Sequence, residues 1–598
     1  MTSSGDERGR ASGWIDQGRV LSGAMHYFRV HPDQWRDRLE RLAAMGLDTV
    51  ETYIPWNFHE RVRGEFDFAG WRDVVRFIRL AETNGLGVIV RPGPFICAEW
   101  DNGGLPTWLG YDHPVALRTS DPHFLAPVDR WFDELLPLLV PLQRTNGGPI
   151  VAVQVENEYG SFGSDLDYLV HLHDGLRARG IDVPLFTSDG PTDLMIDSGT
   201  LPEVDVTANF GSGAAKAIAV LRRRRPGQPI FCAEFWGGWF DHWGRSHNAR
   251  MAADVVAAVR PLLDAGGSVN IYMAHGGTSF GTWPGANIDH QTFLPTVTSY
   301  DSDAPIGEAG ELREKFWALR ELFTETSGRR APAPPPPLPV QTPRVLPIRL
   351  GAPLLTALRG IASVVADSAL PLAQEELRQP AGVTLYESTI LIPQGESVLR
   401  VHEPRDRAWV FLDGELVHRV DRNMPDDGYG LSGERRTAAL SVVVENEGRV
   451  NFGRHVGERK GLLGGVSVDA HGVSRLVHGW RQYAVDLQSV DEVPAVGATR
   501  LASEGDGIPG LYGVTVDCEA VADAFLSLPG WEKVYVRLNG FLLGRLDRRG
   551  PQQTLYAPAP LWVPGDNEID ILSMGEAGEA LAILDCPDLG PVEQYTSH

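Results

Sequence analysis

The strongest constraint on the fold is a series of eight short apolar runs in the first half of the chain. In order, the runs are RVLSGAMHY, DTVETYIPW, GVIVRPGP, PIVAVQVENE, VPLFTSDG, VDVTANF, PIFCAEFW and SVNIYMAHGG. Apolar residues recur at helical spacing in several of the gaps between them, for example within residues 32–46, 71–85 and 166–180. Eight strands that alternate with helices over about 300 residues predict a closed (β/α)8 barrel, or TIM barrel, rather than an open sheet.

The second half of the chain has a different character. The segment RRAPAPPPPLPVQTPR, residues 329–344, predicts an extended spacer, because proline prevents a helix or a central strand. Beyond it, short strands separated by glycine turns predict two all-β domains of the jelly-roll or sandwich type. Both WVFLDGELV and VYVRLNGFLLG place a tight Asp-Gly or Asn-Gly turn between apolar runs, which favours two domains of similar design.

Together these patterns predict a multidomain chain with six parts. They are an N-terminal tail (1–12), the barrel (13–328), the proline-rich linker (329–344), strands that pack on the β-domains (345–383), a first β-sandwich (384–484) and a second β-sandwich (485–598). At 598 residues the chain is too long for a single hydrophobic core, which agrees with this division.

The composition excludes several classes of partner. The formal net charge of −24 would repel the phosphates of nucleic acid or of an anionic membrane, whereas it permits a neutral ligand. No apolar run approaches the ~18 residues that span a bilayer, and the N-terminal sequence lacks the apolar core of a signal peptide. The four cysteines lack the spacing of a zinc site or of a disulfide framework. We therefore predict a cytoplasmic protein without metal or cofactor, and we leave a homo-oligomer open.

Acidic and aromatic residues gather where the predicted barrel strands end. The stretch IVAVQVENEYG, residues 150–160, ends a buried strand with Asn157 and Glu158, and the run PIFCAEFW carries Glu234 and Trp236. An unpaired buried carboxylate costs several kcal/mol, so these residues need a reason to be there. The active site of a (β/α)8 barrel lies at the carboxyl ends of its strands. Two carboxylates among aromatic rings suit a sugar, which stacks on the rings while the acids serve an oxocarbenium-like transition state.

Several longer motifs of the chain have counterparts in one known family. They are TYIPWNFHE, RPGPFICAEWDNGGLPTWL, GGPIVAVQVENEYG, EFWGGWFDHWG, HGGTSFG and TSYDSDAP in the barrel, with VENEGRVNFG and GPQQTLYAP beyond it. This set resembles glycoside hydrolase family 35, the β-galactosidases. The resemblance implies a retaining exo-β-galactosidase that removes terminal non-reducing β-D-galactosyl residues through a covalent glycosyl-enzyme. Its substrate would be a β-galactoside oligosaccharide or glycoconjugate, and it would need no cofactor.

The same resemblance implies roles for individual residues. Glu158 would be the general acid/base, Asn157 would hold the sugar 2-hydroxyl, and Glu234 would be the nucleophile. Further residues fall where the family contacts galactose, namely Tyr53, Ala98, Glu99 and Tyr300. Glu99 would take hydroxyls near C3 and C4 of the ring, and Tyr300 would lie close enough to Glu234 to steady its charge.

The chain departs from the family pattern at three positions. Trp236 stands two residues after the nucleophile, where animal relatives carry tyrosine. Thr282 replaces a tyrosine that lines the sugar pocket, and Ser279 stands where asparagine is usual. We expect Trp236 and Trp243 to provide the aromatic platform for the sugar.

Three alternatives to a galactosidase stay open at this point. Trp236 and Thr282 permit another specificity within the family, such as a β-glucosaminidase or a linkage-restricted β-1,3-galactosidase. A second alternative is a carbohydrate-binding protein without catalysis. The third is a serine esterase, because GTSFG matches a GxSxG elbow around Ser279, although Pro284 prevents the helix that must follow.

Other polar residues near the strand ends have structural interpretations. We expect Glu156 to pair with Arg91 inside the barrel rather than to take part in catalysis. The histidines in these regions lack the spacing of a metal site, so we expect them to be hydrogen-bonded. They are His26, His59, His242 and His275.

Overall fold

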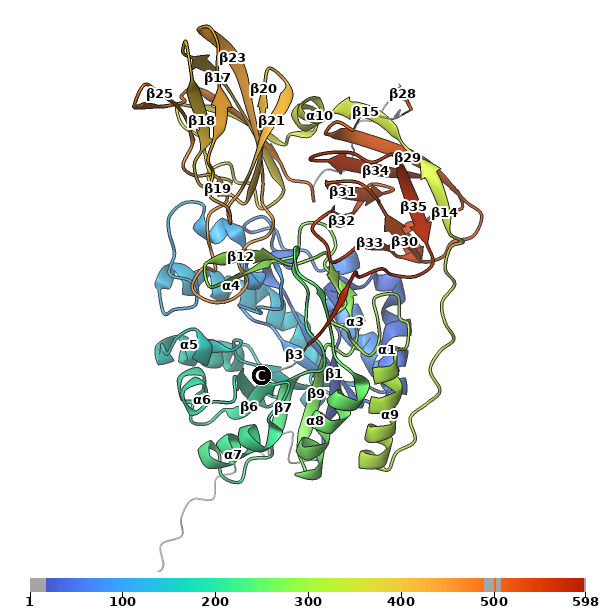
Figure 1. The fold of residues 1–598 in the computed structure, drawn as a ribbon. Helices are drawn as coiled ribbons and strands as arrows, with labels where there is room; N and C mark the ends of the chain where they lie inside the picture. Colours follow the sequence, from blue (N-terminus) through green and yellow to red (C-terminus); the bar gives the residue numbers. More distant parts are fainter. Residues whose placement is uncertain (1–17, 489–499, 502–506, 596–598) are drawn as a thin grey trace, which may run out of the picture.

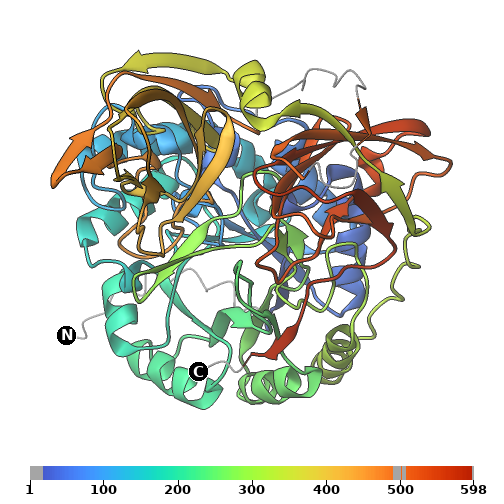
Figure 2. The ribbon, with the colours of Figure 1, turned by 45° about the horizontal axis from the view of Figure 1, so that its top comes forward.

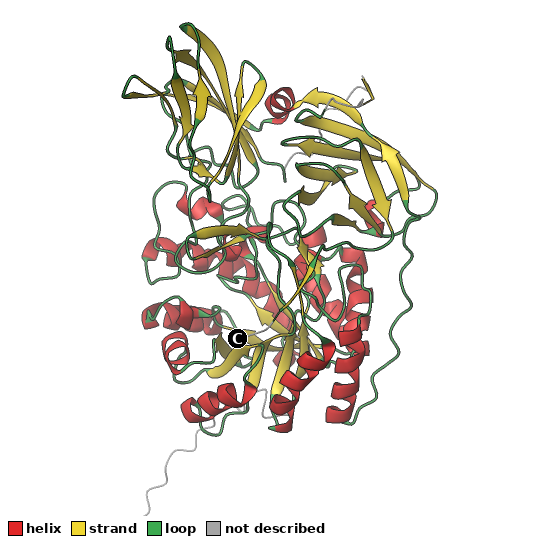
Figure 3. Ribbon diagram, in the orientation of Figure 1, coloured by secondary structure: helices red, strands yellow, loops and turns green. Residues whose placement is uncertain are grey.

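The first half of the chain forms a closed barrel of eight parallel strands (Figures 1 and 3). This computed structural model describes residues 18–488, 500–501 and 507–595, so the predicted tail at residues 1–12 lies outside the described residues. The strands follow chain order around the barrel: β1 (Leu21–Ala24), β2 (Thr49–Tyr53), β3 (Gly87–Arg91), β4 (Ile150–Gln154), β5 (Leu185–Asp189), β6 (Asp205–Phe210), β7 (Phe231–Trp236) and β9 (Ser268–Tyr272). Each strand lies within one of the eight apolar runs, so the predicted (β/α)8 barrel is confirmed.

Burial on both faces explains why these strands appear as continuous apolar runs. Every residue of β2, β4 and β5 is buried, because side chains of the interior cover one face and helices cover the other. The helices are α1 (Trp35–Ala44), α3 (Val74–Thr83), α4 (Pro122–Leu139), α5 (Leu166–Ala178), α6 (Asp193–Gly199), α7 (Ala214–Arg224), α8 (Ala252–Asp264) and α9 (Glu314–Ser327), with a short α2 (Trp56–His59) after β2. The helices predicted from apolar spacing are α1, α3 and α5.

Local signals set the ends of these helices, as α3 illustrates. The Asp73 side chain accepts a hydrogen bond from the backbone N–H of Arg76 at 2.8 Å and so caps the first turn. After the last turn, Gly85 adopts a φ of 71°, a left-handed conformation that is accessible to glycine at little cost.

The proline-rich linker runs along the outside of the molecule from α9 to the β-domains (Figure 1). All residues from 329 to 343 are described, and they form no helix and no strand of a sheet. Val340 makes one isolated bridge with Asp523. Residues 329–343 therefore connect the barrel to the β-domains outside any helix or sheet, and Arg344, the last residue of the predicted linker, is the first residue of β14 (Arg344–Pro347).

Beyond the linker, the described chain forms two β-sandwiches, each with a six-stranded and a four-stranded sheet (Figure 1). In the first sandwich, the strand order of the six-stranded sheet is β16 (Val364–Ser368), β27 (Trp480–Val485), β17 (Val383–Ile392), β23 (Arg436–Glu445), β20 (Arg407–Leu412), β21 (Glu415–Asp421). The strand order of its four-stranded sheet is β22 (Tyr429–Leu431), β18 (Ser397–Val401), β25 (Val466–Ala470), β26 (Val473–Leu476). In the second sandwich, the strand order of the six-stranded sheet is β28 (Arg500–Leu501), β15 (Arg349–Pro353), β29 (Gly510–Cys518), β34 (Gly565–Ser573), β31 (Lys533–Leu538), β32 (Phe541–Asp547). The strand order of its four-stranded sheet is β14 (Arg344–Pro347), β35 (Ala580–Leu584), β30 (Ala524–Ser527), β33 (Thr554–Ala557). The prediction of two all-β domains after the barrel is confirmed.

The two predicted tight turns join corresponding hairpins of the two sandwiches. Asp413 and Gly414, with φ of 52° and 90°, connect β20 to β21. Asn539 and Gly540, with φ of 50° and 82°, connect β31 to β32. Two consecutive positive φ angles are typical of the type I′ turn, which matches the twist of a hairpin.

The two sandwiches are interleaved in the sequence and share a hydrophobic cluster. Strands β14 and β15 precede the first sandwich in the sequence, yet they pair with β35 and β29 of the second. Helix α10 (Leu354–Ile361) follows them, and its Leu358 packs in one hydrophobic cluster with Trp409 of β20 and Tyr535 of β31. The second domain is therefore assembled from segments on both sides of the first.

Short strand pairs complete the structure. They are β10 (Gly277–Thr278) with β13 (Ser299–Tyr300), β11 (Ala286–Asp289) with β12 (Thr292–Pro295), and β19 (Pro404–Arg405) with β24 (Gly461–Leu462). Strand β36 (Val592–Gln594) pairs in parallel with β8 (His247–Ala249), so the red end of the chain returns to the barrel (Figures 1 and 2). Among the described residues, no helix has both the length and the apolar character required to span a membrane.

Candidate active site

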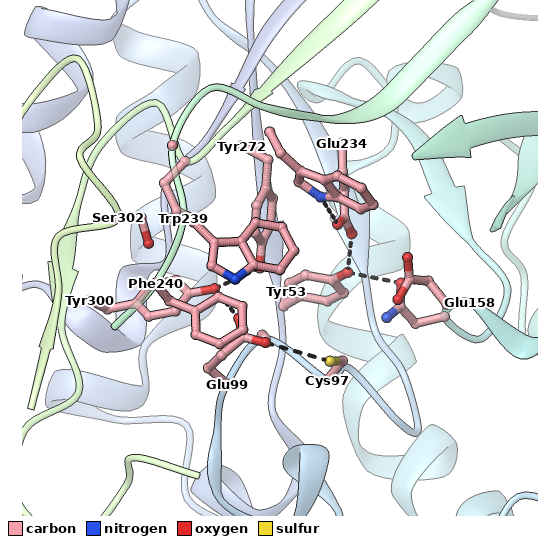
Figure 4. A pocket seen from close by; sticks show the side chains of 15 residues that line it. Tyr53, Cys97, Glu99, Glu158, Glu234, Trp239, Phe240, Tyr272, Tyr300 and Ser302 are labelled. Carbon is pink, nitrogen blue, oxygen red and sulfur yellow. Dashed lines mark hydrogen bonds between the residues drawn. The ribbon is translucent and has the colours of Figure 1, made fainter. Parts of the chain in front are cut away.

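A pocket at the carboxyl ends of the barrel strands collects eight of the residues predicted to act on or bind a sugar. They are Tyr53, Ala98, Glu99, Asn157, Glu158, Glu234, Trp236 and Tyr300. The empty volume is about 500 Å³ with the open mouth included. Figure 4 shows that side chains from segments far apart in the sequence face the same space.

Glu234, on β7, is surrounded by groups that favour a charged carboxylate. Arg91 Nη1 lies 2.7 Å from Glu234 Oε1, and the Tyr53 hydroxyl donates a hydrogen bond to the same oxygen at 2.8 Å. The indole N–H of Trp236 donates to Oε2 at 3.2 Å. Because the Glu234 side chain is only 8% exposed, water competes little with these partners. A cation and two donors stabilise the anionic form of a buried carboxyl group.

Glu158, which follows β4, has a contrasting environment. Its Oε1 accepts a hydrogen bond from the side-chain amide of Asn209, at the end of β6, with a distance of 2.9 Å. Burial, and then the charge of Glu234, raise the pKa of Glu158 to about 8. The raised pKa keeps Glu158 protonated to higher pH, which a general acid requires.

Glu99 lies on the loop after β3 and is bound by a tyrosine. The Tyr300 hydroxyl donates to Glu99 Oε2, and it lies 3.3 Å from the Tyr272 hydroxyl. Burial raises the pKa of Glu99 to about 7. The expected partnership of Tyr300 with Glu234 is therefore wrong, because Tyr300 binds Glu99 and Tyr53 supplies the hydroxyl to Glu234.

The aromatic wall of the pocket differs in part from the prediction. Trp236 lines the pocket, and so do Trp239 and Phe240 from the loop after β7 (Figure 4). The prediction for Trp243 is wrong, because this side chain is buried in the hydrophobic core of the second sandwich. Tyr595 stacks on Trp239 with ring centroids 5.2 Å apart and an interplanar angle of 13°, so the segment after β36 supports this wall.

Glu156 lies outside the pocket lining, but its partner differs from the predicted one. Arg118 binds the Glu156 carboxylate through Nε and Nη2, each at 2.8 Å. Arg91 instead forms its ion pair with Glu234. Sequence spacing could not identify Arg118, because it belongs to the irregular loop before α4.

Sequence reasoning missed two polar residues of the site. Asn209 is the last residue but one of β6 and binds the Glu158 carboxyl group, and Tyr272 ends β9 and lines the pocket. Both are polar residues at the carboxyl end of a predicted strand, which is the signal that identified the other site residues.

Two of the departures from the family pattern lie elsewhere. Within the described chain, the lining of the sugar-sized pocket does not include Thr282 or Ser279. Thr282 lines a smaller neighbouring pocket, and Ser279 Oγ accepts a hydrogen bond from Arg29 Nε at 3.0 Å. Trp236 is therefore the departure that faces the pocket.

Most of the histidines near the strand ends are hydrogen-bonded, as their spacing predicts. His59 Nδ1 lies 2.8 Å from the carbonyl oxygen of Asp67, and His242 Nε2 lies 3.0 Å from Asn287 Oδ1. The prediction is wrong for His275, because neither of its ring nitrogens has a hydrogen-bond partner. Across residues 18–488, 500–501 and 507–595, no group of three or more His, Cys, Asp or Glu side chains could hold a metal ion.

Comparison with known proteins connects this geometry to a family. Glycosyl hydrolases family 35 matches residues 15–326, the first all-beta domain of beta-galactosidase matches residues 371–486, and its galactose-binding domain matches residues 509–567. Beta-galactosidase from Mus musculus is 38% identical over 595 residues, which cover 93% of this chain and 89% of that protein. Beta-galactosidase-1-like protein 3 from Mus musculus is 38% identical over 568 residues, which cover 94% and 85%. The chain is therefore a glycoside hydrolase and belongs to glycosyl hydrolase family 35.

Proposed function

We propose that this glycoside hydrolase is a retaining exo-β-galactosidase with Glu234 as nucleophile and Glu158 as general acid/base. The observation that carries the proposal is the unequal environment of these two carboxyl groups within one pocket. Glu234 has the Arg91 cation at 2.7 Å, whereas burial and the Glu234 charge raise the pKa of Glu158 to about 8. A retaining mechanism begins with an ionised nucleophile and a protonated acid. The cation beside Glu234 and the raised pKa of Glu158 support this assignment of the two roles.

The reaction would then proceed in two displacements. Glu158 protonates the glycosidic oxygen while Glu234 attacks the anomeric carbon, so the aglycone leaves with the proton and a glycosyl ester forms. In the second step, ionised Glu158 takes a proton from water, which attacks the anomeric carbon and releases the Glu234 carboxylate. Because esterification removes the charge of Glu234, it also lowers the pKa of Glu158 and suits Glu158 to the role of base.

The fixed orientation of Asn157 supports a role in holding the sugar 2-hydroxyl. Its Oδ1 accepts a hydrogen bond from Arg91 Nη2 at 2.7 Å and lies 2.9 Å from the Tyr53 hydroxyl, whose single proton is shared with Glu234. These bonds orient the amide; its Nδ2 group donates one hydrogen bond to the carbonyl oxygen of Ile96 at 3.3 Å, which leaves its second N–H as the donor for a sugar hydroxyl. Glu99 and Tyr300 would bind hydroxyls near C3 and C4, and Trp236 would stack on the C–H face. A pocket, in contrast to an open groove, favours removal of a terminal sugar residue from the substrate.

A β-glucosaminidase is the second candidate, because Trp236 is a departure from the family pattern that lines the pocket. This side chain lines the pocket at a position where animal relatives carry tyrosine. A screen with nitrophenyl β-D-glycosides of galactose, glucose, glucosamine and fucose decides between the two sugars. We expect the highest kcat/KM with the galactoside, and a higher value with the glucosaminide would replace galactose as the substrate.

The assigned nucleophile is tested with the Glu234→Gln variant and a nitrophenyl β-galactoside. We expect kcat to fall by ~10³-fold or more, because the variant cannot form the glycosyl ester. Glu308→Gln is the matched control, since Glu308 is also a buried glutamate but lies outside the pocket lining. Retained activity in Glu234→Gln, or release of α-galactose as the first product, would contradict the mechanism.

A further inference from the structure

A segment of the first sandwich reaches the barrel loop that carries Glu99. After β23, residues 446–457 leave the sandwich and lie against the barrel beside the hairpin of β11 and β12 (Figure 1). The backbone N–H of Ala286 donates to the carbonyl oxygen of Arg449 at 3.0 Å. The backbone N–H of Asn451 donates to the carbonyl oxygen of Ala286 at 2.9 Å. These two bonds fix the position of Asn451 relative to the barrel.

The side chain of Asn451 contacts two residues that line the sugar pocket. It is fully buried, and its Nδ2 donates to Glu99 Oε1 at 3.4 Å and to Cys97 Sγ at 3.5 Å. Figure 4 shows Cys97 and Glu99 beside each other in the pocket. The other oxygen of Glu99 accepts a hydrogen bond from Tyr300 of the barrel. Each oxygen of the Glu99 carboxylate therefore has a donor from a different domain.

The loop that carries Glu99 depends on support from its surroundings. Cys97, Ala98 and Glu99 have φ angles of 58°, 55° and 48°, in the left-handed region where non-glycine residues are strained. Such a conformation persists only where neighbouring structure holds it. The first sandwich also holds the next turn of this loop, because the N–H of Arg449 donates to Asp101 Oδ1 at 2.7 Å.

Two glycines allow this close approach of the domains. A Cβ atom on Gly103 would lie 2.9 Å from the carbonyl oxygen of Asn451 and would overlap the ring of Phe95. A Cβ atom on Gly285 would lie 3.0 Å from Asn451 Oδ1. A side chain at either position would therefore push Asn451 away from Glu99.

We propose that Asn451 is a positioning residue of the sugar site, which fixes the Glu99 carboxylate from outside the barrel. The assignment rests on the proposed function, in which Glu99 binds hydroxyls of the galactosyl ring. The Nδ2 group donates hydrogen bonds, so it stabilises the charged form of Glu99, which accepts hydrogen bonds from sugar hydroxyls. The first sandwich is then a part of the sugar site as well as a support for the barrel.

The test compares Asn451→Asp and Asn451→Ala with the control Asn423→Asp. Asn423 also joins the first sandwich to the barrel, through hydrogen bonds of 2.8 Å to the N–H and the carbonyl oxygen of Phe293. It lies outside the pocket lining. With a nitrophenyl β-galactoside, we expect kcat/KM to fall by about tenfold or more in both Asn451 variants, mainly through KM. We expect kcat/KM of Asn423→Asp to stay within about twofold of the parent value, even if its Tm falls as much as the Tm of the Asn451 variants.

The pH profile separates positioning from a loss of stability. Loss of the Nδ2 donors raises the pKa of Glu99, so the acid limb of kcat/KM moves to higher pH in Asn451→Ala. A change in stability alone would leave that limb in place. An unmoved limb, or an equal loss of kcat/KM in Asn423→Asp, overturns the role of Asn451. Activity in Glu234→Gln would overturn the proposed function itself, whereas an inactive Glu234→Gln leaves the role of Asn451 to be decided by its own variants.

Discussion

Arg91 Nη1 lies 2.7 Å from Glu234 Oε1, and the same nitrogen lies 3.6 Å from Glu51 Oε1 deeper in the barrel. All three side chains are almost completely buried, so the cation compensates two carboxyl groups in a region with little water. Burial raises the pKa of Glu51 to about 7. A protonated Glu51 leaves Arg91 free to serve Glu234, which is the carboxyl group that faces the pocket.

Removal of the Tyr53 hydroxyl should reduce catalysis more than stability. Tyr53→Phe deletes the hydroxyl that donates to Glu234 Oε1 at 2.8 Å and lies 2.9 Å from Asn157 Oδ1, so we expect kcat/KM to fall by ~10–100-fold. Tyr168→Phe is the matched control, because its hydroxyl donates to Glu156 Oε1 at 3.0 Å, outside the pocket. Steady-state kinetics give kcat/KM of both variants, and an equal loss of kcat/KM in the two would refute a specific role for Tyr53.

The raised pKa of Glu158 predicts an alkaline limit to activity. A general acid must carry its proton, so kcat/KM for an alkyl β-galactoside should fall as the pH rises through about 8. Glu158→Ala should remove this limb and lower kcat/KM by ~10²–10⁴-fold for the alkyl galactoside. For a dinitrophenyl galactoside, whose leaving group needs no proton, kcat/KM of Glu158→Ala should fall much less. Equal losses for the two substrates would contradict the role of acid.

Buried carboxyl groups should make the protein less stable at alkaline pH. Burial raises the pKa of Glu99 to about 7 and the pKa of Glu308 to about 8, whereas unfolded glutamate titrates near 4.3. Between these values the native state holds protons that the unfolded state releases, so the free energy of unfolding decreases as the pH rises. Thermal unfolding should therefore give a lower Tm at pH 8.5 than at pH 5.5.

The Glu308→Gln variant isolates one contribution to this slope. Thr278 Oγ1 donates to Glu308 Oε1 at 2.7 Å, and the glutamine oxygen can accept the same bond without an ionisable proton. We expect Tm at pH 8.5 to rise by ~2 °C or more, with a smaller change at pH 5.5. Glu434→Gln, at an exposed site, should leave the slope unchanged. A parallel shift of both curves would argue against ionisation of Glu308 as the cause.

Lys533 should be essential to the junction of the two sandwiches. Its Nζ lies 2.8 Å from Glu445 Oε2 and 3.3 Å from Asp547 Oδ2, and it also binds Glu447, with all four side chains buried. Lys533→Met would leave these carboxylates without their shared cation, so we expect a loss of ~3–5 kcal/mol in the free energy of unfolding. Arg548→Met removes an exposed pair and should cost at most ~1 kcal/mol. Denaturant titration measures both, and similar losses would disprove the special position of Lys533.

The sequence predicted the elements whose pattern is set by local burial. Strands such as β4 are buried on both faces and therefore appear as apolar runs. The pair Asp413-Gly414 identifies the turn between β20 and β21, because both positions of this turn have positive φ and Asp and Gly tolerate it. The convergence of Glu158 and Glu234 follows from the same barrel geometry, since polar residues at strand ends meet at one face.

The features that could not be predicted depend on the path of loops and on the docking of domains. Trp239 and Trp243 lie in one short segment, and only the path of the chain after β7 decides that Trp239 faces the pocket. Arg118 reaches Glu156 from an irregular loop. Asn451 reaches Glu99 from another domain, and no spacing in the sequence records that contact.

Because Tyr595 stacks on Trp239, one wall of the pocket depends on a residue that is synthesised after the barrel and both sandwiches. The ribosome makes every barrel strand before it makes either sandwich, and it adds β36 and this ring after both. A nascent chain can therefore close its barrel while one wall of the sugar pocket still lacks its backing. The wall formed by Trp239 can gain this support only after the barrel and both sandwiches have been made.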